Sequence, residues 1–132
     1  MIAMIVEDDV DMNQLLKMIV HDEMKIPVEQ FYDGDEAIKR LESDQEKPGL
    51  IILDLHLSNV SGWEVFDAIR QKTKFPVAIV TADRIAAVNF VDKADAVFTK
   101  PWNMMEFIVK LTSLIAQEEQ NGSEGRTTRG NG

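Results

Sequence analysis

Charged and hydroxyl side chains follow several short apolar runs in this sequence. Three carboxylates, a hydroxyl and an ammonium recur in this way, in the residues Glu7, Asp8, Asp54, Thr81 and Lys100. Carboxylates brought together repel one another and favour a counter-charge, and Mg²⁺ prefers oxygen ligands of this kind. A hydroxyl and an ammonium are donors suited to phosphoryl oxygens. The set therefore predicts a magnesium-assisted site in which one carboxylate accepts a phosphoryl group.

Asp54 is the residue around which the other groups are expected to gather. Residues 50–53 form a continuous apolar run, which is typical of a strand buried on both faces in a parallel sheet. In open α/β sheets, ligands bind at the carboxyl edge of the strands. On its own, Asp54 could equally end a strand or cap the next helix. The polar groups that follow the other strands favour a site.

The elements that would position these groups alternate along the chain. Short apolar runs predict strands, and apolar residues at helical spacing predict helices between them. Five strands alternating with five helices predict a parallel, doubly wound α/β sheet with helices on both faces. The predicted strands are residues 2–6, 28–32, 50–53, 77–80 and 96–99. The predicted helices are residues 11–22, a segment after Asp33 that carries Ala37, Ile38 and Leu41, and residues 63–69, 85–91 and 104–117.

Composition narrows the class of protein. The chain has 132 residues, 45% of them hydrophobic, which suits one domain with a real core. Its formal net charge of -9 argues against nucleic-acid binding, and the absence of cysteine excludes disulfides and thiolate metal sites. No apolar run approaches membrane-spanning length, so we expect a cytoplasmic protein.

Residues 121–132 contain no apolar side chain. We therefore expect a domain at 1–118 and a disordered linker or cloning remnant at 119–132.

Four short motifs resemble those of the receiver domain of two-component response regulators. They are IVEDD, LIILDL, VTA and TKP, each at the end of a predicted strand and in the family's order. The resemblance covers residues 1 to about 118. It implies a flavodoxin-like fold with strand order 2-1-3-4-5 and a cis-proline after the lysine. It also implies a protein that catalyses only its own phosphorylation and dephosphorylation.

The resemblance assigns a role to each candidate residue. The implied partners are a histidine kinase or a histidine phosphotransfer protein, with a possible homodimer and with neither nucleic acid nor membrane. The implied cofactor is Mg²⁺. Asp54 resembles the phosphoacceptor, Asp8 the direct metal ligand, Glu7 the acid that holds the metal through water, His56 the residue whose backbone carbonyl completes the metal shell, Thr81 the switch hydroxyl and Lys100 the phosphate-binding lysine.

The sequence also departs from the family's pattern. Ser58 stands where a proline is usual, and Lys93 replaces a glycine before the last strand. Val97 occupies the position of the aromatic switch residue, and Phe98 cannot substitute for it because adjacent strand side chains point to opposite faces. The segment from Thr81 to Lys100 is also a few residues short. These changes leave the phosphorylation chemistry intact and put the usual output mechanism in doubt.

Two other classes of protein share parts of this pattern. Haloacid-dehalogenase phosphatases also use an Asp nucleophile after a buried strand, but they need a second Asp two residues later, where this chain has His56. The alternative that stays open is a degenerate receiver that acts as a phosphorylation-independent protein-interaction module. Phosphorylation with Mg²⁺ and a phosphoryl donor would separate it from a working receiver.

Overall fold

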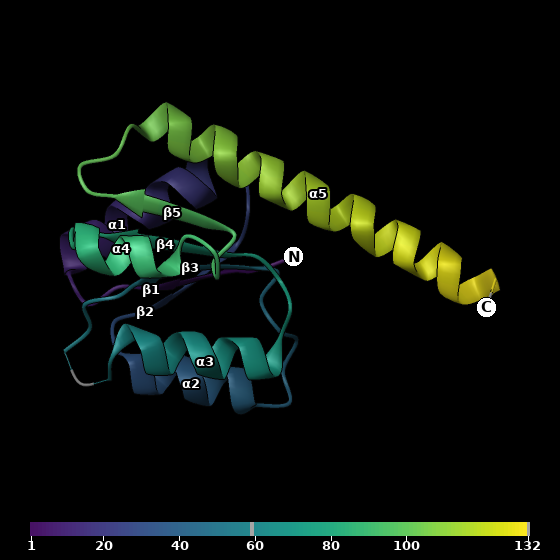
Figure 1. Ribbon diagram of the computed structural model, residues 1–132, viewed down its shortest axis with the longest axis horizontal. Coiled ribbons are helices and arrows are strands. Elements are labelled where there is room, and N and C mark those ends of the chain that lie inside the picture. Colours follow the sequence, from purple (N-terminus) through teal and green to yellow (C-terminus); the bar gives the residue numbers. More distant parts are fainter. Residues whose placement is uncertain (59, 132) are drawn as a thin grey trace.

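The computed structural model describes residues 1–58 and 60–131, which form a parallel five-stranded sheet between two layers of helices (Figure 1). The strand order is β2-β1-β3-β4-β5, so the order implied by the resemblance is confirmed. The three inner strands are completely buried, as their continuous apolar runs predicted. The strands are β1 (Ala3–Val6), β2 (Val28–Phe31), β3 (Leu50–Asp54), β4 (Val77–Thr81) and β5 (Ala96–Thr99).

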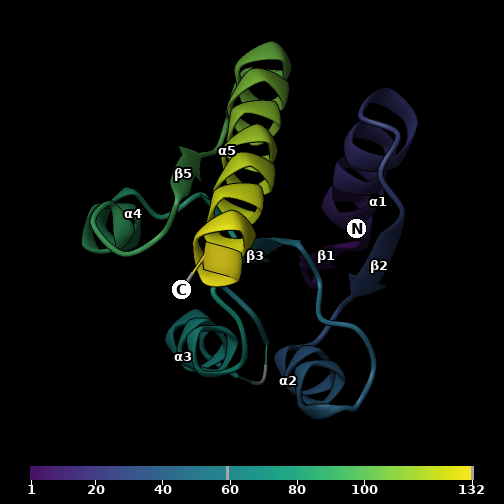
Figure 2. The ribbon, with the colours of Figure 1, turned by 90° about the vertical axis from the view of Figure 1, so that its right-hand side faces the viewer.

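Helices cover both faces of this sheet, and each face has its own apolar core (Figure 2). One core joins α1 and α5 to the sheet and includes Leu16, Phe107 and Leu111. The other joins α2, α3 and α4 to the sheet and includes Leu41 and Phe90. The helices are α1 (Val10–Lys17), continued by the π-helical turn η1 (Met18–Glu23), then α2 (Gly34–Glu42), α3 (Gly62–Lys72), α4 (Arg84–Phe90) and α5 (Met104–Asn131).

Polar side chains fix the starts of the helices that follow the strands. The carboxylates of Asp9, Asp33 and Asp83 and the hydroxyl of Ser61 each accept a hydrogen bond from a backbone amide of the helix that follows. Such caps satisfy amides that have no partner within the helix. Because these helices follow strands along the chain, the caps lie in the loops at the carboxyl edge of the sheet.

The first helix differs from the predicted one in its buried face. Met12, Leu15, Leu16 and Ile19 have the spacing of one apolar helix face, but Leu15 is 41% exposed and Asn13 is completely buried. The helix also ends in a wider turn, in which the amide of Met24 donates to the carbonyl of Ile19 at 3.1 Å. A polar residue therefore occupies the core side of α1, which the apolar spacing alone did not indicate.

The last helix is longer than predicted. The sequence predicted an end near Gln117, because the glycines and threonines that follow are poor helix formers. In the structure α5 continues to Asn131 and extends well past the sheet (Figure 1), so the predicted helix end is wrong. A helix can satisfy its own backbone hydrogen bonds without contact to the rest of a domain, which accounts for the difference. The division into a domain at 1–118 and a linker at 119–132 stays a prediction.

Among the described residues, none of the helices combines the length and the apolar character that crossing a membrane requires.

Candidate functional site

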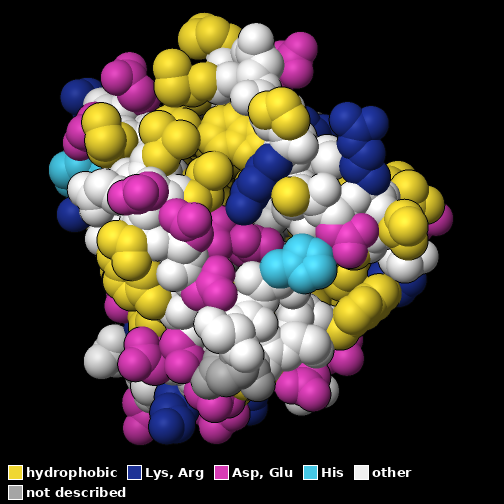
Figure 3. All heavy atoms as spheres, turned by 90° about the vertical axis from the view of Figure 1, so that its left-hand side faces the viewer, with side chains coloured by type: hydrophobic (Ala, Val, Ile, Leu, Met, Phe, Trp, Pro, Cys, Tyr) yellow, Lys and Arg dark blue, Asp and Glu magenta, His cyan; other side chains and the backbone are white. Residues whose placement is uncertain are grey.

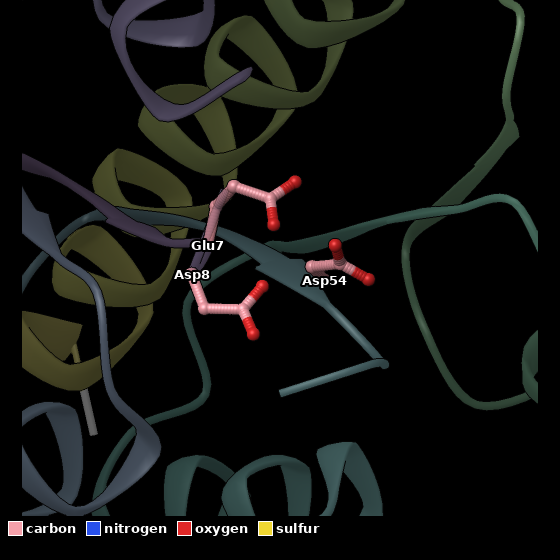
Figure 4. Close-up of side chains that lie close together, drawn as sticks. All are labelled: Glu7, Asp8 and Asp54. Carbon is pink, nitrogen blue, oxygen red and sulfur yellow. The ribbon is translucent and has the colours of Figure 1, made fainter. Parts of the chain in front are cut away.

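Three carboxylates meet at the carboxyl edge of the sheet. Glu7 and Asp8 directly follow β1, Asp54 ends the neighbouring β3, and all three side chains project in the same direction past the strand ends (Figure 4). One carboxylate oxygen from each residue lies within 4.8 Å of the other two. Seen from this edge, acidic side chains gather at the centre of the molecular face (Figure 3). Three hard oxygen donors at this spacing suit Mg²⁺, so the donor set fits the cation that the sequence predicted.

Lys100 supplies the positive charge at this edge. Its ammonium donates to Glu7 Oε1 at 3.0 Å and to Asp54 Oδ2 at 3.2 Å. The two acids outweigh the effect of burial, which alone would lower it, and raise the pKa of Lys100. Lys100 is thus held in its charged form between two acids, directly before the cis peptide bond to Pro101 that the resemblance implied.

Glu7 is the most strongly perturbed acid of the site. Its side chain is 1% exposed. Burial first, and then the hydrogen bond and charge of Asp54, raise the pKa of Glu7 to about 8, with Lys100 acting in the opposite direction. One lysine therefore does not compensate the buried acids fully, and the site favours an additional cation or a proton.

Residues 7–9, here called the acid loop, are held by neutral donors and by the first helix. The Asp9 carboxylate accepts from the amide of Met12 at 2.9 Å and caps α1. Ser58, which stands in the place of the usual proline, donates its hydroxyl to Asp8 Oδ2 at 2.9 Å. The loop after β3 thus contacts the acid loop across the site, which the sequence did not indicate.

The backbone just after Asp54 is also fixed. The amide of His56 donates to Asp54 Oδ1 at 2.9 Å, so one oxygen of Asp54 faces the loop and the other faces Lys100. Farther along, the amide of Gly62 donates to the carbonyl of Leu55 at 3.1 Å. A Cβ at Gly62 would lie 2.5 Å from the Leu55 Cα, so only glycine allows the start of α3 to approach the loop this closely.

Thr81 lies at the end of β4, on the other side of Asp54 from β1. The strand register pairs Asp54 with Val80, so Thr81 lies one residue beyond that pair. Its hydroxyl is completely buried with the residue and accepts from the amide of Asp83 at 3.1 Å. The Asp83 carboxylate caps α4 and lies 3.2 Å from Nε2 of His56. The cap from Ala86 foremost, and His56 after it, hold the pKa of Asp83 below its usual value.

The structure therefore brings the predicted residues together at the carboxyl edge of the sheet, where they have different hydrogen-bond partners. Glu7, Asp54 and Lys100 are in direct contact, and Asp8 lies beside them. Thr81 lies at the same edge but bonds to Asp83. The sequence analysis gave His56 a role only through its backbone carbonyl, whereas its side chain reaches the Asp83 carboxylate that caps α4. Its position two residues after Asp54 gave no signal of a partner 27 residues away.

The side chains of Val97 and Phe98, adjacent residues of β5, point to opposite faces of the sheet. Val97 contacts the core on the α3 and α4 side, and Phe98 contacts the opposite core, where its ring centroid lies 4.7 Å from that of Phe107. The prediction that Phe98 cannot take the place of an aromatic residue at position 97 is consistent with this alternation. The carboxyl edge around Asp54, here called the acceptor edge, thus contains all the polar groups that the sequence predicted. The neighbouring strand β5 has a valine at position 97.

Comparisons with known proteins identify the family. Residues 3–112 match the family of the response regulator receiver domain. The response regulator ArlR of Staphylococcus aureus is 28% identical over an alignment of 123 residues, and the match covers 89% of this chain and 53% of that protein. The chain therefore spans about half the length of the curated relatives it matches.

Solved structures agree with this match. The signal receiver domain of a protein described as a Luxo repressor, from Vibrio parahaemolyticus, is 30% identical with a TM-score of 0.80, and the likeness covers 92% of this chain and 94% of that one. A two-component response regulator from Clostridium difficile is 27% identical with a TM-score of 0.77, covering 87% and 95%. The chain therefore belongs to the response regulator receiver domains, which act in two-component signalling and are not conventional enzymes.

Proposed function

We propose that this receiver domain accepts a phosphoryl group on Asp54 and signals by the change of conformation that follows. The observation that supports this most is the contact of Lys100 with both Glu7 and Asp54 beside a third carboxylate, Asp8. Such a set combines a nucleophilic oxygen with the positive charge that a phosphoryl group requires. The proposed donor is a histidine kinase or a histidine phosphotransfer protein.

In the proposed transfer, a carboxylate oxygen of Asp54 attacks phosphorus. The bond from phosphorus to the donor's imidazole nitrogen breaks, a phosphorus–oxygen bond forms, and the departing nitrogen keeps the electron pair. The ammonium of Lys100, already 3.2 Å from Asp54 Oδ2, then pairs with the new phosphoryl oxygens. The Thr81 hydroxyl would exchange its contact with the Asp83 amide for a bond to the phosphoryl group.

The residues that would hold Mg²⁺ are Asp8 and Asp54 directly, Glu7 through water, and the backbone carbonyl of His56. When bound, the cation would neutralise charge on the phosphoryl oxygens during transfer. Glu7 and Asp8 lie in the loop that directly follows β1, and the hydroxyl of Ser58 donates to Asp8 from the loop after β3. Hydrolysis of the aspartyl phosphate by water would return the domain to its starting state.

Incubation with acetyl phosphate tests this proposal. With Mg²⁺, intact-mass spectrometry should detect one added phosphoryl group, which disappears in Asp54→Asn and when EDTA replaces Mg²⁺. Asp95→Asn is the matched control, because Asp95 is another hydrogen-bonded acid, bound to Arg70 and to the amide of Val77 away from the site. Labelling that persists in Asp54→Asn would contradict the assignment. A parent chain that takes up no phosphate would favour the degenerate, phosphorylation-independent receiver.

A further inference from the structure

Asn13 is a buried polar residue that takes no part in the proposed phosphoryl transfer. It lies in α1 and is completely buried, although asparagine is a weak helix former and a buried amide is costly unless it is hydrogen-bonded. Its own backbone amide makes the first helical bond, to the carbonyl of Asp9 at 2.9 Å. Helix formation alone therefore gives no reason for asparagine here, so the reason must lie in its side chain.

The side-chain amide of Asn13 connects the ends of two strands. Its Nδ2 donates to the carbonyl of Glu7 at 2.8 Å and to the carbonyl of Phe31 at 3.0 Å. Its Oδ1 accepts from Nε2 of Gln30 at 2.9 Å, which fixes the plane of the amide. The carbonyl of Phe31 also accepts from the amide of Glu7 at 3.0 Å. The segment at Glu7 is thus held at both its N–H and its C=O.

The carbonyl of Glu7 belongs to the peptide unit that leads into Asp8. Because a peptide unit is planar, fixing this oxygen also fixes the Cα of Asp8 and the directions in which both acidic side chains leave the backbone. The carboxylates of Glu7, Asp8 and Asp54 repel one another, and this repulsion pushes the acid loop away from β3. Asn13 reaches none of the carboxylates, and it acts on them only through the backbone.

We propose that Asn13 is a positioning residue that holds the acid loop so that Glu7 and Asp8 face Asp54 at cation-binding spacing. This inference rests on the proposed function, because it takes the three carboxylates to be the Mg²⁺ site. Residues that orient metal ligands from behind typically change metal affinity without contacting the metal. Asn13 would thereby set the affinity for Mg²⁺, with little effect on the phosphoryl transfer once the site is full.

The test compares Mg²⁺ affinity with fold stability in the full chain. Isothermal titration with MgCl₂ gives the Kd, and thermal unfolding in EDTA gives the stability of the metal-free protein. In Asn13→Ala we expect the Kd for Mg²⁺ to rise about tenfold, while the rate of labelling by acetyl phosphate at saturating Mg²⁺ stays within about twofold. Gln30→Leu removes the donor to Asn13 Oδ1, together with an exposed 3.4 Å contact to Gln14 Oε1, and should raise the Kd in the same direction by less.

Arg40→Gln is the matched control for a merely structural role. Arg40 also holds β2, through three contacts of 2.9–3.1 Å to Glu29, but Glu29 pairs with Met4 at a distance from the acid loop. The Arg40→Gln variant should have a lower melting temperature, with its Kd for Mg²⁺ within about twofold of the parent.

Three outcomes would overturn the inference. An unchanged Kd in both Asn13→Ala and Gln30→Leu, with a lower melting temperature, would overturn it alone. If Asn13→Ala fails to fold, an unchanged Kd in Gln30→Leu has the same meaning. A parent chain that binds no Mg²⁺ would overturn the proposed function and this inference together.

Discussion

The acceptor edge and the face formed by α4 and β5 differ in what holds them. At the acceptor edge, each predicted side chain has a hydrogen bond or an ion pair, and Lys100 joins two strands by contacting Glu7 and Asp54. On α4, in contrast, Ile85 and Val88 are 80% and 71% exposed, and Phe90 is the large side chain that anchors the helix. The two regions are thus held by different interactions, and we expect the proposed phosphorylation to be coupled only weakly to the face of α4 and β5.

The largest effect that this comparison predicts concerns the anchor of α4. Phe90 is completely buried, with its ring centroid 4.1 Å from that of Trp63 and 5.1 Å from that of Phe66. Phe90→Ala should lower the free energy of unfolding by about 3–5 kcal/mol, as measured by urea denaturation. Ile85→Ala on the same helix should stay within about 0.5 kcal/mol of the parent. Similar losses in both variants would show that α4 is held in some other way.

Next in size is the loss of the lysine at the acceptor edge. Lys100→Met leaves two buried acids without their cation and should destabilise the metal-free protein by about 3 kcal/mol at pH 8. The loss should shrink at pH 5, where Glu7 carries a proton. Urea unfolding at the two pH values measures this. A loss that is equal at both would mean that Lys100 does not compensate the acids.

Mg²⁺ should stabilise the fold by relieving the same repulsion. A cation that binds only the folded protein raises the free energy of unfolding by about 2.7 kcal/mol at a hundredfold excess over its Kd. Asp8→Ala should remove most of this gain, because Asp8 is one of the three acids of the set. Thermal unfolding with and without MgCl₂ is the measurement. A melting temperature that is indifferent to millimolar Mg²⁺, or a gain that persists in Asp8→Ala, would contradict the site.

A further effect is expected from the titration of Glu7 in the metal-free protein. Folding raises the pKa of Glu7 from its ordinary value of 4.5 to about 8, so the folded state binds the proton more tightly than the unfolded state does. This contribution to stability is fully present below pH 4.5 and is lost as the pH rises through 8. In EDTA, the free energy of unfolding should therefore fall across this window in the parent and fall less in Glu7→Gln. If the free energy of unfolding falls equally with pH in the parent and in Glu7→Gln, Glu7 is not the source of the pH dependence.

Much of the fold and of the site followed from the sequence because the signals are local. Continuous apolar runs marked the buried strands, and the polar residue after each run marked the carboxyl edge, as at Asp54 and Lys100. The partners of those residues were not readable. Ser58 reaches Asp8 from 50 positions away, and the close approach at Gly62 depends on how α3 returns to its strand.

Asn13 shows a signal that was present but not used. An asparagine three residues before Leu16 lies on the buried side of an amphipathic helix, where a polar residue needs a reason. Apolar spacing alone assigned Leu15 to that face, because two adjacent leucines fit either rotation of the helix. For α5, in contrast, the local signal was misleading. The glycines and threonines after Gln117 predict the end of the helix there, but the helix continues to Asn131.

One measurement tests the central claim, a complete acceptor site beside a face without an aromatic switch. It compares amide NMR spectra with and without beryllofluoride, in the presence of Mg²⁺, for the parent and for Val97→Tyr. Valine is short and stiff, so its placements differ little in energy, and a tyrosine has more surface to couple. We predict strong shifts near residues 7–9, 54–58, 81–84 and 100 in the parent, weak shifts across 96–98 and 104–111, and larger shifts there in the variant. Large parent shifts across 96–111 that do not grow in Val97→Tyr would contradict the account.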